Sequence, residues 1–248
     1  MNYLILVFWV LSLFLSTSFI ALYVRKYKKS DIIIAFYVVY IALSQILAAK
    51  IAVFWNWTAP VAVIIFPFTF QLTDTMNEHF GQKETHKMIF IAFLTQILMV
   101  IFIWFGNSLE PAVFWWVDND QWLSIFGQSI AITAASWISF LLTENLDAWL
   151  YQKIKKWTKG KMLWVRSVLS DIPVLALDSV IFVTLAFGVF SPSQWAIVPT
   201  TILGQLLTKW FFGVLDTPFM YLDRFIVNYK TGDKEKPSKI ETESEKFE

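Results

Sequence analysis

Residues 200–222 read TTILGQLLTKWFFGVLDTPFMYL, a segment long and apolar enough to cross a lipid bilayer. Lys209 lies near its middle, and Asp216 follows about two helical turns later. A charged side chain at membrane depth is costly unless another group pairs with it. The segment therefore predicts a membrane helix whose lysine meets acidic groups from other helices, an arrangement typical of proteins that carry polar cargo or protons.

The composition also indicates a membrane protein. Hydrophobic residues make up 57% of the chain and charged residues 16%, whereas soluble domains carry about 25% charged residues. A net charge of +1 argues against a nucleic-acid partner. The chain has no cysteine and two histidines, so we expect no thiol chemistry and no multi-histidine metal site. It offers no nucleophile–base pair and no glycine-rich phosphate loop, so we expect neither an enzyme nor a cofactor.

Seven apolar stretches set the expected architecture, an all-α polytopic membrane protein with seven transmembrane helices. The first stretch lacks the basic start of a signal peptide, so it predicts a retained anchor helix. The stretches are 2–24, 31–54, 60–79, 88–106, 123–151, 168–190 and 195–219.

The basic residues predict the orientation of these helices. Loops 55–59, 107–122 and 191–194 contain no lysine or arginine, and every basic residue except Lys50 and Lys209 falls on the opposite side. Basic loops face the cytoplasm. We therefore expect a multi-pass protein of the cell membrane with its N-terminus outside and its C-terminus inside. Residues 226–248 are polar and charge-mixed, which predicts a disordered cytoplasmic tail.

Ionisable residues recur at helical spacing in four of the stretches, so each stretch presents one polar face at a similar depth. We expect these faces to form a single polar cavity between the cytoplasmic half and the middle of the membrane. The pairs are Asp74 with Glu78, Glu144 with Asp147, Asp171 with Asp178, and Lys209 with Asp216.

Several of these residues have a simpler interpretation. Asp171 precedes Pro173 and can cap the start of a helix. Lys50 can extend its long side chain to the outer surface. Groups near the inner surface can be solvated, and these are Glu78, Asp216, His79 and His86.

The run FPFTFQLTDTMNEHFGQKETHKMIF at 66–90 resembles the signature of the queuosine precursor transporter family, also called vitamin-uptake-transporter-like. Further stretches are similar in the same order along the chain. They are SQILAAK at 44–50, LDAWLYQKIKKWTKGK at 146–161, LALDSVIFVTLAF at 175–187 and LTKWFFGVLDTPFMY at 207–221. The resemblance implies import of 7-deazaguanine bases without a dedicated ATPase.

The resemblance also implies a fold and a set of residues. A six-helix core over 31–225 would be similar to the substrate-binding subunits of energy-coupling-factor transporters, with residues 1–30 adding one helix and a basic loop. The matching positions are Lys50, Asp74, Asn77, Glu78, Asp147, Asp178, Lys209 and Pro218. Members usually carry glutamine where this chain has Glu144, and often a polar residue where it has Leu175, so the substrate stays open.

A deazaguanine presents a ring N–H beside an exocyclic amine, and one carboxylate can accept both. The sequence offers four such carboxylates, while Lys209 can pair with an acid or donate to the base carbonyl, and aromatic rings can stack on the base. Spare carboxylates offer a route for protons. The expected substrate-binding residues are Lys50, Phe70, Asp74, Asn77, Glu78, Trp137, Glu144, Asp147, Asp178, Lys209 and Trp210.

Two other functions fit parts of the pattern. A lysine in a seventh helix is typical of retinal-binding rhodopsins, but those carry an aspartate one turn earlier, where this chain has Gln205. A vitamin-binding membrane subunit that needs an ATPase partner fits as well. The sequence leaves open whether the chain acts alone or as a homodimer.

Overall fold

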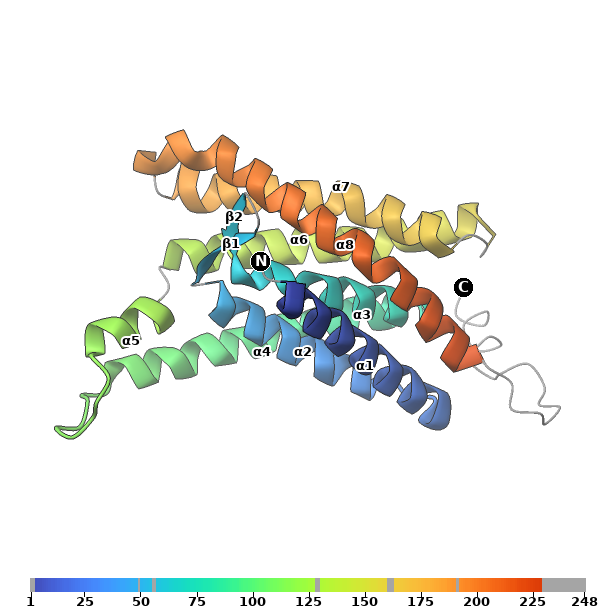
Figure 1. Ribbon diagram of the computed structural model, residues 1–248, viewed down its shortest axis with the longest axis horizontal. Coiled ribbons are helices and arrows are strands. Elements are labelled where there is room, and N and C mark those ends of the chain that lie inside the picture. The colour runs from blue at the N-terminus through green and yellow to red at the C-terminus, as the bar shows by residue number, and fades with distance from the viewer. Residues whose placement is uncertain are drawn as a thin grey trace.

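The computed structural model describes residues 3–48, 50–54, 57–127, 130–159, 163–190 and 192–228. Long helices run along one axis of the molecule (Figure 1). A short hairpin of two strands connects the second long helix to the third. The elements are α1 Tyr3–Tyr27, α2 Asp31–Leu47, β1 Ile51–Phe54, β2 Trp57–Pro60, η1 Val61–Ile64, α3 Phe66–His79, α4 Gln82–Ser108, α5 Asn119–Phe126, α6 Ile130–Trp157, α7 Leu163–Val183, η2 Thr184–Val189, η3 Pro192–Ile197 and α8 Val198–Asn228.

The helices have the apolar surfaces of a membrane protein. Four helical stretches are long and apolar enough to cross a bilayer: Tyr3–Tyr27, Gln82–Ser108, Leu163–Val189 and Trp195–Asn228. Helix α2 is also apolar but has only 17 residues. On α4 the exposed side chains Phe90, Leu94, Leu98 and Phe102 recur every fourth residue, as expected of a face turned toward lipid. A largely helical membrane protein is therefore confirmed, while the number of seven spans stays a prediction.

Helix α3 lies in the interior of the bundle. Every residue from 67 to 77 is buried, so this helix has no face of its own toward solvent or lipid. Its polar residues therefore have to find partners on the surrounding helices, because a buried polar group without a hydrogen bond is destabilising. Helix α3 packs against α8, α2, α4 and α6. The segment with the most polar interior positions thus supplies the middle of the site.

Three element boundaries differ from the sequence prediction. The second apolar stretch does not continue to 54, because α2 ends at Leu47 and β1 pairs antiparallel with β2, with Ile51 opposite Pro60. The fifth stretch is divided between α5 and α6. Asp171 is no helix cap, since α7 is already helical at Leu163 and Pro173 lies inside it.

Helix α8 continues to Asn228, and the rest of the predicted tail lies outside the described residues.

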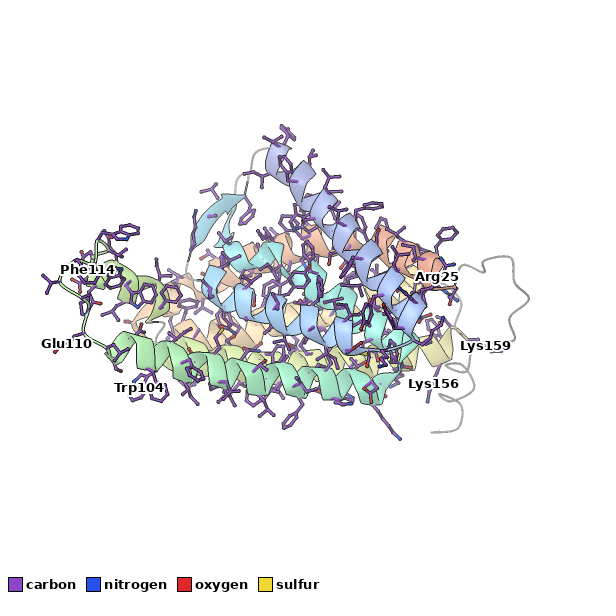
Figure 2. The ribbon with its side chains drawn as sticks, turned by 90° about the horizontal axis from the view of Figure 1, so that it is seen from below. Arg25, Trp104, Glu110, Phe114, Lys156 and Lys159 are labelled. Carbon is purple, nitrogen blue, oxygen red and sulfur yellow. The ribbon has the colours of Figure 1, made fainter. Side chains whose placement is uncertain are left out.

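The two ends of the bundle differ in chemistry. Arg25, Lys156 and Lys159 lie at one end, and Trp104, Glu110 and Phe114 lie toward the other (Figure 2). Gly81, with φ 83°, makes the turn from α3 into α4 at the basic end. Loops that the sequence assigns to one side of the membrane therefore do lie together in space.

Helix α1 is packed into the bundle rather than lying apart from it. Trp9 and Leu13 of α1 form a buried cluster with Phe68 of α3 and Phe212 of α8. The indole N–H of Trp9 donates to the carbonyl of Ile64 over 2.7 Å. The segment 1–30 thus contributes directly to the packing of α3.

Candidate functional site

Four carboxylates from four different helices meet inside the bundle. Carboxylate oxygens of Asp74 on α3, Asp147 on α6 and Asp171 on α7 all lie within 4.8 Å of one another. Asp216 on α8 interacts electrostatically with Asp171 and Asp147. All four side chains are buried, with residue exposures between 0% and 5%. We refer to Asp74, Asp147, Asp171 and Asp216 as the acidic cluster.

Few hydrogen bonds satisfy the acidic cluster. Ser167 and Ser170 of α7 donate to the two oxygens of Asp171 over 3.1 and 3.3 Å. Among the described residues, neither oxygen of Asp147 has a hydrogen-bond partner. One oxygen each of Asp74 and Asp216 is buried without a partner as well. The cluster therefore keeps several acceptors available for a ligand that donates hydrogen bonds or carries positive charge.

Lys209 has its own acidic partner, separate from the acidic cluster. Its ammonium group forms an ion pair with Asp178 of α7, and Ser139 of α6 donates to the other oxygen of Asp178 over 2.5 Å. The same ammonium lies 4.5 Å from the ring centroid of Phe66, whose ring is 6.3 Å from that of Phe70. The cost of burying this lysine is thus offset by a carboxylate and an aromatic face.

Glu144 is held by two hydroxyl groups. Tyr37 of α2 donates to its carboxylate over 2.6 Å, and Thr73 of α3 donates over 3.2 Å. Tyr37 is fully buried. No sequence signal marks Tyr37, because it stands in an apolar stretch without any charged neighbour.

Trp137 lies beside a group of neutral polar side chains. Gln45 of α2 donates to Gln96 of α4 and to Ser136 of α6, both over 3.0 Å. The indole N–H of Trp137 is buried without a partner in the described structure, and its ring meets Phe93 edge-on at 5.7 Å. These residues offer neutral donors and an aromatic ring on the side of α6 that faces α2 and α4.

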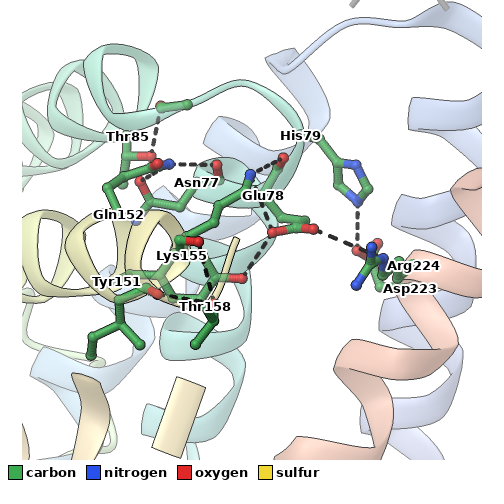
Figure 3. A network of polar contacts seen from close by, with 12 residues as sticks. Asn77, Glu78, His79, Thr85, Tyr151, Gln152, Lys155, Thr158, Asp223 and Arg224 are labelled. Carbon is green, nitrogen blue, oxygen red and sulfur yellow. Dashed lines mark hydrogen bonds and ion pairs between the residues drawn. The ribbon is translucent and has the colours of Figure 1, made fainter. Parts of the chain in front are cut away.

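Asn77 and Glu78 belong to a network at the basic end of the bundle (Figure 3). Glu78 forms ion pairs with Lys155 at 3.3 Å and with Arg224 at 3.9 Å. The side chain of Gln152 donates to the backbone carbonyl of Asn77 over 2.8 Å. Glu78 therefore joins the ends of α3, α6 and α8 and does not lie with the acidic cluster.

The expectation of a solvated histidine is wrong for His79, whereas His86 is half-buried. His79 pairs with Asp223 over 2.8 Å, and both side chains are at most 8% exposed. His86 lies 2.6 Å from the side-chain oxygen of Asn145 and 2.9 Å from Gln82. Both rings are held between helices because α3 and α4 continue up to a short turn, which leaves no open loop around them. Asp216 is also buried rather than solvated.

Two further expected site residues lie apart from these groups. Lys50 is exposed between α2 and β1, in keeping with its simpler interpretation. The indole N–H of Trp210 donates to the backbone carbonyl of Ile172 over 3.3 Å, which joins α8 to α7. Neither side chain contacts the acidic cluster in the interactions that the structure describes.

The expected single chamber is replaced by separate polar groups. A small pocket of about 10 Å³, with room for about one water molecule, lies between α1, α3 and α8, and Asp223 is the one carboxylate among its lining residues. Gln71 of α3 crosses toward α1 close by and donates to Thr17 over 2.6 Å. The deep charges themselves form the Lys209–Asp178 pair, the Glu144 group and the acidic cluster.

Comparisons with known proteins identify the family of the chain. The chain is 22% identical over 220 residues to the "Probable queuosine precursor transporter" of Bacillus subtilis (strain 168), a match that covers 86% of this chain and 92% of that protein. No solved structure matches the chain. The model of the family described as "Putative vitamin uptake transporter" matches residues 60–222, about two thirds of the chain. The chain therefore belongs to this family of membrane transporters.

Proposed function

We propose that this protein imports a queuosine precursor, a 7-deazaguanine base, or a closely related planar base across the cell membrane. The main support is the Lys209–Asp178 pair, in which a buried donor and a half-buried acceptor lie beside the rings of Phe66 and Phe70. The relative from Bacillus subtilis supports the class of substrate.

The chemistry of the base complements this pair. Its ring N–H and exocyclic amine would donate to the carboxylate of Asp178, and its carbonyl oxygen would accept from Lys209. A base that enters between the two side chains would thus replace their direct contact with charge-assisted hydrogen bonds to each of them. Phe66 and Phe70 offer aromatic faces next to the ammonium for stacking. Of the carboxylates that the sequence suggests for this role, Asp178 is the one paired with Lys209.

The coupling and orientation are part of the same proposal. Transport would be secondary, driven by an ion gradient with protons as the expected ion, and the basic end in Figure 2 would face the cytoplasm. A substrate-binding subunit that depends on an ATPase partner is the alternative. Uptake by the purified protein alone in liposomes, with and without a proton gradient, separates the two.

The test of the binding site is uptake of a labelled 7-deazaguanine base by cells that express variants. Asp178→Asn should reduce uptake at least about tenfold, because an amide cannot accept both donors of the base with charge assistance. Glu84→Gln is the matched control, since Glu84 is partly exposed on α4 and pairs only with Lys87 among the described contacts. Uptake at the control rate by a correctly inserted Asp178→Asn protein would contradict the proposal.

A further inference from the structure

The acidic cluster has no role in the proposed binding of the base. Its four carboxylates would carry a charge of −4 if all were ionised, and they lie on four helices in the membrane interior. Among the side chains that the structure describes, Lys209 is the one buried lysine or arginine, and it already pairs with Asp178. That lysine is therefore not available to neutralise the cluster.

The geometry of the cluster matches the needs of a metal cation. Hard cations such as calcium take carboxylate and hydroxyl oxygens as ligands at about 2.3–2.6 Å, so opposite ligands stand about 4.6–5.2 Å apart. One carboxylate oxygen from each of Asp74, Asp147 and Asp171 lies within 4.8 Å of the other two. Sodium has nearly the same radius as calcium and prefers the same oxygen ligands.

The unpartnered atoms provide a second, independent observation. Asp147 is fully buried and has two oxygens without a hydrogen-bond partner in the described structure. Asp216, 1% exposed, has one such oxygen and interacts with Asp147 from α8. A cation site needs carboxylate oxygens that are not already used by a hydrogen-bond donor or a basic side chain. Such oxygens are costly to bury unless a ligand binds them.

We propose that Asp74, Asp147, Asp171 and Asp216 form a binding site for a hard metal cation of sodium or calcium size. The cation would join α3, α6, α7 and α8, which also carry Phe66, Phe70, Ser139, Asp178 and Lys209. That bound cation would therefore favour the arrangement of helices in which the Lys209–Asp178 pair is assembled. Its use as the coupling ion rests on the proposed transport function, but its binding does not.

The test is thermal unfolding of the purified protein at pH 8 and constant ionic strength in choline, potassium, sodium or calcium salts. A ligand of the folded state raises Tm in a saturable way, and we expect a rise of about 2 °C or more in sodium or in calcium relative to choline. The two salts distinguish the two cations. The rise should shrink as pH falls, because protons compete for the same oxygens.

Variants test whether the cation-dependent rise in Tm comes from binding at the acidic cluster. Asp147→Asn should abolish the cation-dependent rise, while Glu84→Gln should keep it. If Asp147→Asn does not fold, Asp216→Asn and direct calorimetric titration of the unaltered protein with sodium or calcium provide the same test. A protein whose Tm responds to pH but to neither cation, or an Asp147→Asn protein that keeps the rise, overturns the metal site. Neither result depends on whether the base is transported.

Discussion

At the scale of single residues, the protein keeps a lysine at membrane depth by surrounding it with complementary groups. Asp178 supplies the opposite charge, Ser139 orients that carboxylate, and Phe66 covers the ammonium. Removing one partner of a buried ion pair leaves the other charge uncompensated, which is more destabilising than removing both. The Lys209–Asp178 pair is therefore expected to behave as one unit.

A double-mutant comparison tests this unit. Lys209→Gln should destabilise the protein by about 3 kcal/mol or more, because Asp178 is left without its cation. The double variant Lys209→Gln with Asp178→Asn should recover a large part of that loss, since two neutral amides can bond to each other. Thermal unfolding in detergent measures both variants. Losses that simply add would show that the two side chains do not depend on each other.

At the scale of elements, α1 is joined to α3 by a buried polar contact. Gln71 of α3 is 4% exposed, and its amide donates to Thr17 of α1 over 2.6 Å. The hydroxyl of Thr17 in turn donates to the carbonyl of Leu13. Because α3 is buried on all sides, a change in this contact is transmitted to the helix that carries Asp74.

The variant Thr17→Val isolates this contact without changing the shape of the side chain. It should lower the free energy of unfolding by about 1–3 kcal/mol, because a buried donor on Gln71 loses its acceptor. Thr17→Ser keeps the hydroxyl and should stay close to the unaltered protein. Equal stability of the valine and serine variants would show that the hydrogen bond between Gln71 and Thr17 does not help to hold α1.

The sequence predicted some elements and residues better than others, for physical reasons. Charges such as Lys209 and Asp74 stand out in apolar segments, so their burial could be predicted. Ile51–Phe54 is as apolar as the helix before it, so composition alone could not reveal the hairpin. Tyr37 and Ser139 are neutral and common in helices, so nothing marked them as partners of Glu144 and Asp178.

The sequence predicted which residues share a helix face, but not which residues of other helices lie next to them. Helical spacing places Glu78 one turn from Asp74 on the same face. One turn suffices to move a side chain from the acidic cluster to the network with Lys155 and Arg224 at the basic end (Figure 3). The spacing of residues along one helix does not show which other helix supplies a partner. The sequence therefore predicted one polar chamber where the structure has several separate polar groups.

At the scale of the whole molecule, the basic end and the opposite end, which lies near Glu110, predict how the chain lies in the membrane. The chain contains no cysteine, so a single introduced cysteine can be labelled without background. Glu110→Cys and Lys159→Cys place that thiol at exposed positions at opposite ends of the bundle (Figure 2). In intact cells a membrane-impermeant maleimide should label Cys at 110 and should reach Cys at 159 only after permeabilisation. The reverse pattern would invert the predicted orientation.

The central claim is that a planar base binds between Asp178 and Lys209, and calorimetric titration of the purified protein with a 7-deazaguanine base tests it most directly. We predict saturable binding by the unaltered protein and by Glu84→Gln. The double variant Lys209→Gln with Asp178→Asn, shown to be folded by thermal unfolding, should bind at least about a hundredfold more weakly, since both charge-assisted contacts are lost. Unchanged affinity in the folded double variant, or no binding by the unaltered protein, would contradict the claim.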